Sequence, residues 1–152
     1  MRSASTAATF CLAVSAGWFA FSSRPPSPAP ADPTGGSFPC HVVSVHDGDT
    51  FTCAEQDGAG RSIRIRLAGV DARELGDYCA AGHPCSPAHA DDSTAELRRL
   101  ANGQALSCQP NGTSYNRVSA FCRRSDGVDL SCAMLQGHFV AIWPRYWGGH
   151  RC

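Results

Sequence analysis

Eight cysteines follow residue 38 of this 152-residue chain, and they limit the folds that are open to it. A ninth, Cys11, lies in an apolar N-terminal run. An even number of cysteines in a small exported domain indicates a framework of disulfide bonds. The domain is therefore expected to depend on covalent links as well as on its core, and the residues concerned are Cys40, Cys53, Cys79, Cys85, Cys108, Cys122, Cys132 and Cys152.

Eight cysteines can pair in many ways, and two pairings are favoured. Cys79 and Cys85 would close a short loop, and Cys108 and Cys122 would join neighbouring strands. A zinc site is the alternative, because two histidines lie near the first pair. The chain has no Cys-x-x-Cys pair and no spacing typical of a zinc finger, so disulfides are the better interpretation.

The N-terminus has the features of a targeting segment. Arg2 precedes an uncharged, mostly apolar run over 7–21, which is too short for a standard membrane-spanning helix and is typical of a signal-peptide core. Ala29-Pro30-Ala31 offers small residues for cleavage, although it lies far beyond the apolar run. We expect export to the periplasm or the medium, and the alternative is an uncleaved N-terminal segment that anchors the protein to the membrane.

The chain divides into three parts on composition. Residues 1–31 are the signal peptide or anchor with the start of a linker, and residues 32–37 are the rest of a linker rich in proline, serine and glycine. Residues 38–152 form a single folded domain.

The charge balance of the chain does not suit nucleic-acid binding through net positive charge alone. The formal net charge is zero and the chain has no lysine. Two of the arginines, Arg2 and Arg24, precede residue 31. The rest of the chain therefore contains eleven arginines and thirteen acidic residues. This balance does not favour tight, non-specific binding of nucleic acid. A polyanion would have to be held by a local group of arginines together with a metal ion.

Alternating patterns and turn residues predict a small β-rich fold. Apolar Ile63, Ile65 and Leu67 alternate with arginines, which predicts a strand with one apolar face. A helix is expected from Asp91 or Asp92 as its N-cap to about Ala101. Other strands are expected over 40–45, 50–53, 105–109 and 117–122, another helix over 129–136, and turns over 47–49, 57–60 and 110–112. This order predicts a mainly β fold with helices (α+β), a five-stranded barrel of the oligonucleotide-binding type with two or three helices.

Carboxylates and arginines gather at the ends of these strands. Asp49 and Asp71 could hold a hard cation, since oxygen ligands suit calcium, although Asp49 also lies in an ordinary Asp-Gly-Asp turn. Glu74 is a candidate base for activating water, and Arg66 and Arg117 are candidate phosphate ligands. Each of these residues alone is explained as readily by a solvated surface position.

In combination, these segments resemble the staphylococcal nuclease, or thermonuclease-like, family. The motifs are Val45-His46-Asp47-Gly48-Asp49-Thr50-Phe51, Ile65-Arg66-Leu67-Ala68-Gly69-Val70-Asp71-Ala72-Arg73-Glu74 and Tyr115-Asn116-Arg117-Val118. The resemblance covers 40–143. It implies a calcium-dependent phosphodiesterase acting on DNA and RNA, which is expected to be a monomer.

By motif position the resemblance assigns a role to each residue. The implied calcium ligands are Asp49, Asp71 and the main-chain carbonyl of Ala72. The implied phosphate-binding residues are Arg66 and Arg117. Glu74 takes the place of the general base. Two aromatic residues, Tyr115 and Trp143, are implied to contact substrate. Near the position of Trp143, the family has a tyrosine.

One departure concerns the catalytic loop, where Arg73 stands in place of the proline usual in the family. Two other functions stay open. The domain could bind nucleic acid or another polyanion without cleaving it, because a fold does not fix a function. It could also be a metal-stabilised structural domain of the cell envelope.

Overall fold

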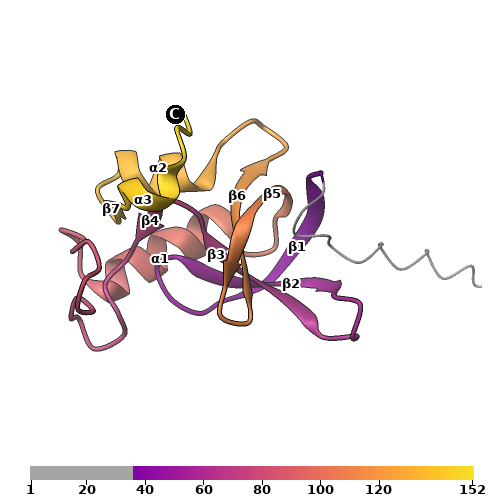
Figure 1. Cartoon of the computed structure of the whole chain (residues 1–152), viewed down its shortest axis with the longest axis horizontal. Coiled ribbons are helices and arrows are strands. Elements are labelled where there is room, and N and C mark those ends of the chain that lie inside the picture. Colours follow the sequence, from indigo (N-terminus) through magenta and orange to yellow (C-terminus); the bar gives the residue numbers. More distant parts are fainter. Residues whose placement is uncertain (1–35) are drawn as a thin grey trace, which may run out of the picture.

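Five strands close into a barrel in the order β1-β2-β3-β6-β5, as the computed structural model of the chain shows (Figure 1). The structure describes residues 36–152, so the predicted signal peptide or anchor and most of the linker lie outside the described residues. The prediction of a five-stranded barrel with helices is confirmed. The barrel strands are β1 (Phe38–Val45), β2 (Thr50–Gln56), β3 (Ser62–Leu67), β5 (Ala105–Ser114) and β6 (Arg117–Arg124).

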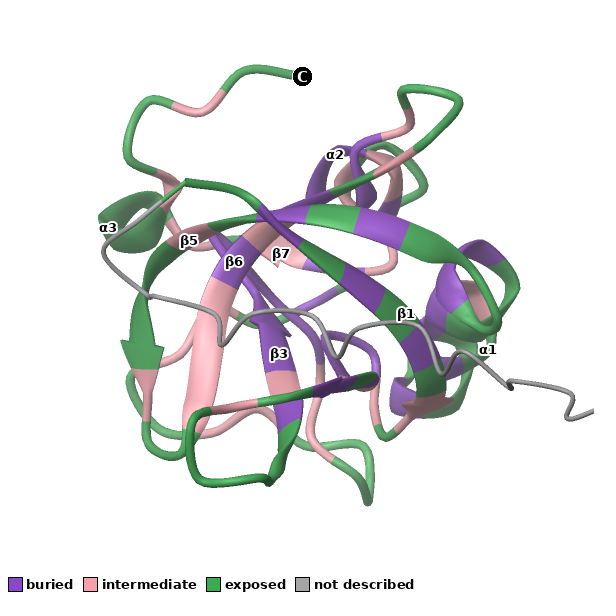
Figure 2. Cartoon of the chain, turned by 90° about the vertical axis from the view of Figure 1, so that its right-hand side faces the viewer, coloured by how far each residue is buried: buried purple, intermediate pink, exposed green. Residues whose placement is uncertain are grey.

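Strand β3 shows why the chain forms a barrel. Ile63, Ile65 and Leu67 are almost fully buried and point into the core, whereas the residues between them face outward. Alternation of this kind is visible along β1 in Figure 2. Strand β3 pairs antiparallel with β2 and parallel with β6, and the parallel pair closes the barrel.

Four disulfides support this small core. The two predicted pairs, Cys79–Cys85 and Cys108–Cys122, are both present, and the others are Cys40–Cys53 and Cys132–Cys152. Because all eight cysteines are paired, none is left as a thiolate ligand for zinc. Four disulfides are typical of proteins that fold in an oxidising environment.

The helices lie to one side of the barrel in Figure 1 and differ in part from the prediction. Helix α1 (Ala90–Ala101) begins with His89 at its N-cap, so the expectation that an aspartate caps it is wrong; Asp91 and Asp92 occupy its first turn instead. There they favour the helix through its dipole. Helix α2 (Leu130–Gln136) begins as predicted, with the Asp129 carboxylate accepting from Cys132 N.

The predicted turn at Pro110-Asn111-Gly112 is wrong. Strand β5 continues through it to Ser114, and the pairing with β6 shifts register between Pro110 and Gly112. Gly112 has a φ of 129°, a conformation that glycine adopts readily, so an irregularity in the strand replaces a reversal. The chain reverses at Tyr115 instead, which has a φ of 56°.

A second, two-stranded sheet brings the C-terminal segment back to the barrel. Strand β4 (Val70–Asp71) pairs with β7 (Ala141–Ile142), and the short helix α3 (Pro144–Trp147) follows. Gly69 permits α3 to approach the chain before β4 closely, since a Cβ at residue 69 would lie 2.6 Å from the ring of Trp147. Within residues 36–152, no helix has the length and apolar character needed to cross a membrane.

Candidate nuclease site

A cavity of about 350 Å³ opens where β3, the β5–β6 hairpin and the C-terminal segment meet. Two predicted phosphate ligands, Arg66 and Arg117, line it, and we call it the arginine cavity. Its size lies within the range of small-ligand sites. The remaining lining residues are Leu67, Gly69, Val70, His83, Asn111, Thr113, Ser114, Tyr115, Ser119, Trp143 and Tyr146.

Arg66 connects this cavity to two of the predicted metal ligands. Its Nη1 lies 2.7 Å from Asp49 Oδ2, and its Nη2 donates to Asp71 Oδ1. All three side chains are largely removed from solvent, with Asp71 only 2% exposed. Residues far apart in sequence are therefore brought together at one edge of the arginine cavity.

Local packing fixes the Asp49 carboxylate. Thr50 Oγ1 donates to its Oδ1 at 2.9 Å, and the main-chain N–H of Ala72 donates to its Oδ2 at 3.0 Å. A Cβ on Gly48 would lie 2.5 Å from Cβ of Ser93 in α1, so only glycine fits between the loop and the helix. The Asp-Gly-Asp segment is thus more than a surface turn, because it anchors a buried carboxylate against β4.

Carboxylates outnumber guanidinium groups around Arg66. Burial and then the charge of Asp49 raise the pKa of Asp47 to about 6. Burial also raises the pKa of Asp71, although Arg66 acts in the opposite direction. Burial acts to lower the pKa of Arg66, but Asp49 and Asp71 outweigh it and raise that pKa. The three carboxylates, which we call the carboxylate cluster, are Asp47, Asp49 and Asp71.

The carboxylate cluster contains two of the predicted calcium ligands, Asp49 and Asp71. Burial is the main cause of the raised pKa values of Asp47 and Asp71, and the negative charge of Asp49 adds to it. Carboxylate and carbonyl oxygens are the ligands that calcium prefers. Ala72, whose carbonyl is the third predicted ligand, is buried beside Asp49 and bound to it through its N–H.

Arg117 reaches the same region from β6. Its Nη1 donates to Thr50 Oγ1 at 3.2 Å, and its Nη2 donates to Ser114 Oγ at 3.3 Å. Both partners are neutral hydroxyls, so its charge is available to an anion in the arginine cavity.

The two predicted substrate-contacting aromatics lie at this cavity rather than in the core. Tyr115 is 98% exposed at the tip of the hairpin. Trp143 is half-buried, with its ring centroid 5.7 Å from Arg66 Cζ and 4.8 Å from the ring of Tyr146. Each ring offers an apolar surface beside the arginines.

Glu74 occupies a different place from the other predicted residues. It is half-buried three residues after Asp71, in a tight turn where its N–H donates to the carbonyl of Tyr78 at 2.9 Å. It is not among the residues that line the arginine cavity. The turn fixes the main chain of Glu74, and the proposed base role of its side chain stays a prediction.

His83 is a site residue that the sequence analysis did not identify. The Cys79–Cys85 disulfide closes the loop that carries it. Its Nδ1 lies 3.3 Å from Asp71 Oδ1, without hydrogen-bonding geometry, and its ring lies 4.4 Å from that of Trp143. The paired cysteines were visible in the sequence, but nothing there placed their loop against Asp71.

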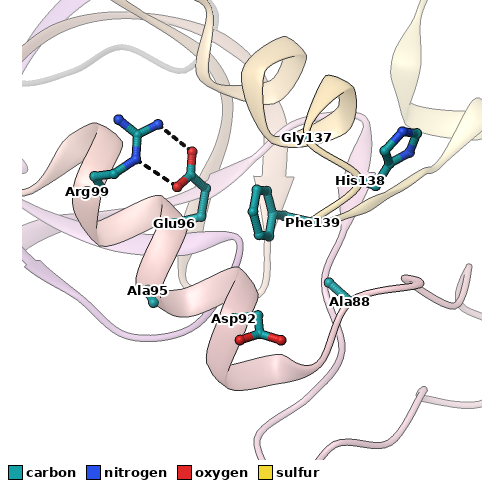
Figure 3. Close-up of a pocket in the computed structure, with 8 residues that line it drawn as sticks. All are labelled: Ala88, Asp92, Ala95, Glu96, Arg99, Gly137, His138 and Phe139. Carbon is teal, nitrogen blue, oxygen red and sulfur yellow. Dashed lines mark hydrogen bonds and ion pairs between the residues drawn. The ribbon is translucent and has the colours of Figure 1, made fainter.

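Another cavity, between α1 and the segment after α2, lacks such a combination of groups (Figure 3). Glu96 and Arg99 neutralise each other there in a paired contact of 2.6 Å, with the ring of Phe139 beside them. In the described part of the chain, two groups of three His, Cys, Asp or Glu side chains have their ligand atoms close enough together for one metal ion, and both contain cysteines that are already in disulfides. Asp47, Asp49 and Asp71 do not form such a group.

Comparison with models of known protein families finds no match for this chain, and comparison with curated proteins finds no significant relative. The resemblance to staphylococcal nuclease, drawn from three motifs, therefore stays a prediction.

Calcium should stabilise the protein measurably. At about one hundred times its Kd, a cation that binds only the folded state contributes about 2.7 kcal/mol, which raises the Tm by roughly 10 °C. Asp49→Asn should abolish this shift, whereas Asp126→Asn, which removes a carboxylate exposed near Arg124, should retain it. Thermal melting with calcium and with chelator is the measurement. Equal Tm values for the wild type in both would contradict a calcium site.

Proposed function

We propose that the protein is an exported calcium-dependent nuclease that hydrolyses phosphodiester bonds of DNA, RNA or both. One observation carries the proposal: Arg66 joins the buried carboxylates Asp49 and Asp71 at the edge of a cavity that Arg117 and Trp143 also line. A phosphodiester needs positive charge around its oxygens and a surface for its base, and this arrangement offers both.

Each residue contributes a distinct part of the proposed reaction. Asp49, Asp71 and the Ala72 carbonyl would hold calcium, which supplies positive charge to the phosphate when it is bound. Arg66 and Arg117 would bind the non-bridging oxygens and stabilise the additional charge of the five-coordinate transition state. Glu74 would accept a proton from the attacking water as the new P–O bond forms and the bond to the leaving oxygen breaks.

Arg66 has a second feature that suits this role. Its two terminal nitrogens are now occupied by the same carboxylates that would bind the cation. Neutralisation of Asp49 and Asp71 by a cation would weaken those ion pairs and leave the guanidinium free for phosphate. Cation binding and phosphate binding are thereby expected to support each other.

Substitution of Arg117 tests the site directly. Arg117→Gln should lower kcat/KM for single-stranded DNA about 10²-fold, because a charged donor to the transition state is lost. Stability should change little, since the partners of Arg117, Thr50 and Ser114, are neutral and Arg117 itself is only half-buried. Arg124→Gln makes the same change farther along β6 at an exposed ion pair and should leave kcat/KM unchanged. Equal rates for the two variants would refute the assignment of Arg117.

A further inference from the structure

Arg64 stands beside the proposed active site without a charged partner. It lies two residues before Arg66 on β3 and opposite Thr52 of β2. Because Ile63 and Ile65 point into the core, Arg64 and Arg66 share the outer face of the strand. Two residues of strand separate their Cα atoms by about 6.6 Å. This spacing is similar to that of successive phosphates in an extended nucleic-acid strand.

The polar contacts of Arg64 are incomplete. Its Nε is buried and has no hydrogen-bond partner. Arg61, Arg66 and four other arginines of the described chain take part in ion pairs, whereas Arg64 takes part in none. A buried donor without an acceptor is costly, and because the Arg64 side chain as a whole is only half-buried, its guanidinium is open to an acceptor from outside the chain.

A third cavity, of about 220 Å³, lies next to Arg64. Its polar residues include Asn116 and Ser62, and Asn116 directly precedes the phosphate ligand Arg117. Asp57 also lines it, but Asp57 already accepts from Arg61 Nε and from two main-chain N–H groups, each at 2.9 Å. We call this cavity the Arg64 pocket.

The positive charge of Arg64 also acts on a neighbouring histidine. Burial, and then the positive charge of Arg64, lower the pKa of the neighbouring His46. His46 itself contacts Thr52, the residue opposite Arg64, through Nε2 and Oγ1 at 2.7 Å.

We propose that Arg64 and the Arg64 pocket bind a second backbone phosphate, next to the one that is cleaved. The substrate strand then runs along the outer face of β3, from the arginine cavity toward Asn116 and Arg64. This inference rests on the proposed nuclease function and makes it more specific: the preferred substrate is an oligonucleotide with consecutive phosphates, and a dinucleotide with one phosphate lacks this contact.

The test compares Arg64→Gln with Arg98→Gln, which removes the same charge from an exposed position on α1. Binding of a single-stranded oligonucleotide of about ten nucleotides is measured with calcium over a range of salt concentrations, on a Glu74→Gln background that is expected to prevent cleavage. Arg64→Gln should weaken binding about tenfold and reduce the slope of log affinity against log salt by about 0.7. Arg98→Gln should do neither, and Arg64→Lys should retain most of the slope.

Dinucleotide hydrolysis with calcium separates the two proposals. Arg64→Gln should hydrolyse a dinucleotide as the wild type does, because the second phosphate is absent. Equal oligonucleotide affinity and salt slope for Arg64→Gln and Arg98→Gln would overturn the Arg64 site, as would failure of the folded protein with Arg64 intact to bind the oligonucleotide in calcium. An Arg64-dependent slope in a protein that hydrolyses nothing would leave the Arg64 site standing and refute the nuclease.

Discussion

Reduction of all four disulfides is expected to unfold the domain. Cys40–Cys53 and Cys108–Cys122 close loops of 13 and 14 residues, and each should contribute about 3 kcal/mol by restricting the unfolded chain. A domain of this size has a total stability of about 5–15 kcal/mol, so loss of all four links removes most of it. Circular dichroism during titration with a thiol reductant is the measurement.

Paired substitutions show which links matter most. Cys40, Cys53, Cys108 and Cys122 are fully buried in the barrel, so replacement of either pair by alanine also leaves a cavity. Cys79 is half-buried, Cys85 is exposed, and the two close the shortest loop, at six residues, so their removal should lower the Tm least. A fully reduced protein that melts within a few degrees of the oxidised one would contradict this view of the fold.

Replacement of Glu74 should produce the largest loss of activity. Glu74→Gln keeps the shape of the side chain and removes its ability to accept a proton. If it is the general base, kcat should fall about 10²–10⁴-fold, while affinity for single-stranded DNA should stay within about twofold. Rates and binding constants are measured on the same protein in calcium.

The matched control is Glu96→Gln, which changes a carboxylate paired with Arg99 in the cavity of Figure 3. It should leave both kcat and affinity unchanged. If Glu74→Gln behaves as this control does, Glu74 is not the base. Measurable binding without turnover in the wild type would favour the alternative of a non-catalytic module for nucleic acid.

The barrel could be predicted because its strands carry their own signal. Alternation of Ile63, Ile65 and Leu67 with arginines requires a strand with one buried face, and the structure has β3 there. The β5–β6 reversal could not be predicted in the same way. Proline, asparagine and glycine at 110–112 favour a turn locally, but pairing along β6 outweighs that preference and moves the reversal to Tyr115.

The candidate site was predictable only as a set of residue types. Asp49, Asp71 and Arg66 stand at strand ends in the sequence, and the structure brings their side chains into contact. The position of His83 depends on long-range packing of a disulfide-closed loop, which no local pattern specifies. The sequence likewise does not show that Arg64 lacks an ion pair and that its Nε lacks an acceptor, because this depends on which residues contact each arginine in the fold.

The most direct test of the proposed function is hydrolysis of single-stranded DNA and of RNA by the oxidised, folded protein. The assay compares calcium, magnesium and chelator under otherwise equal conditions. We expect cleavage with calcium that stops when chelator removes it, because Asp49 and Asp71 provide oxygen ligands and excess negative charge. Absence of cleavage of both substrates in calcium, by protein shown to hold all four disulfides, would contradict the assignment of a nuclease.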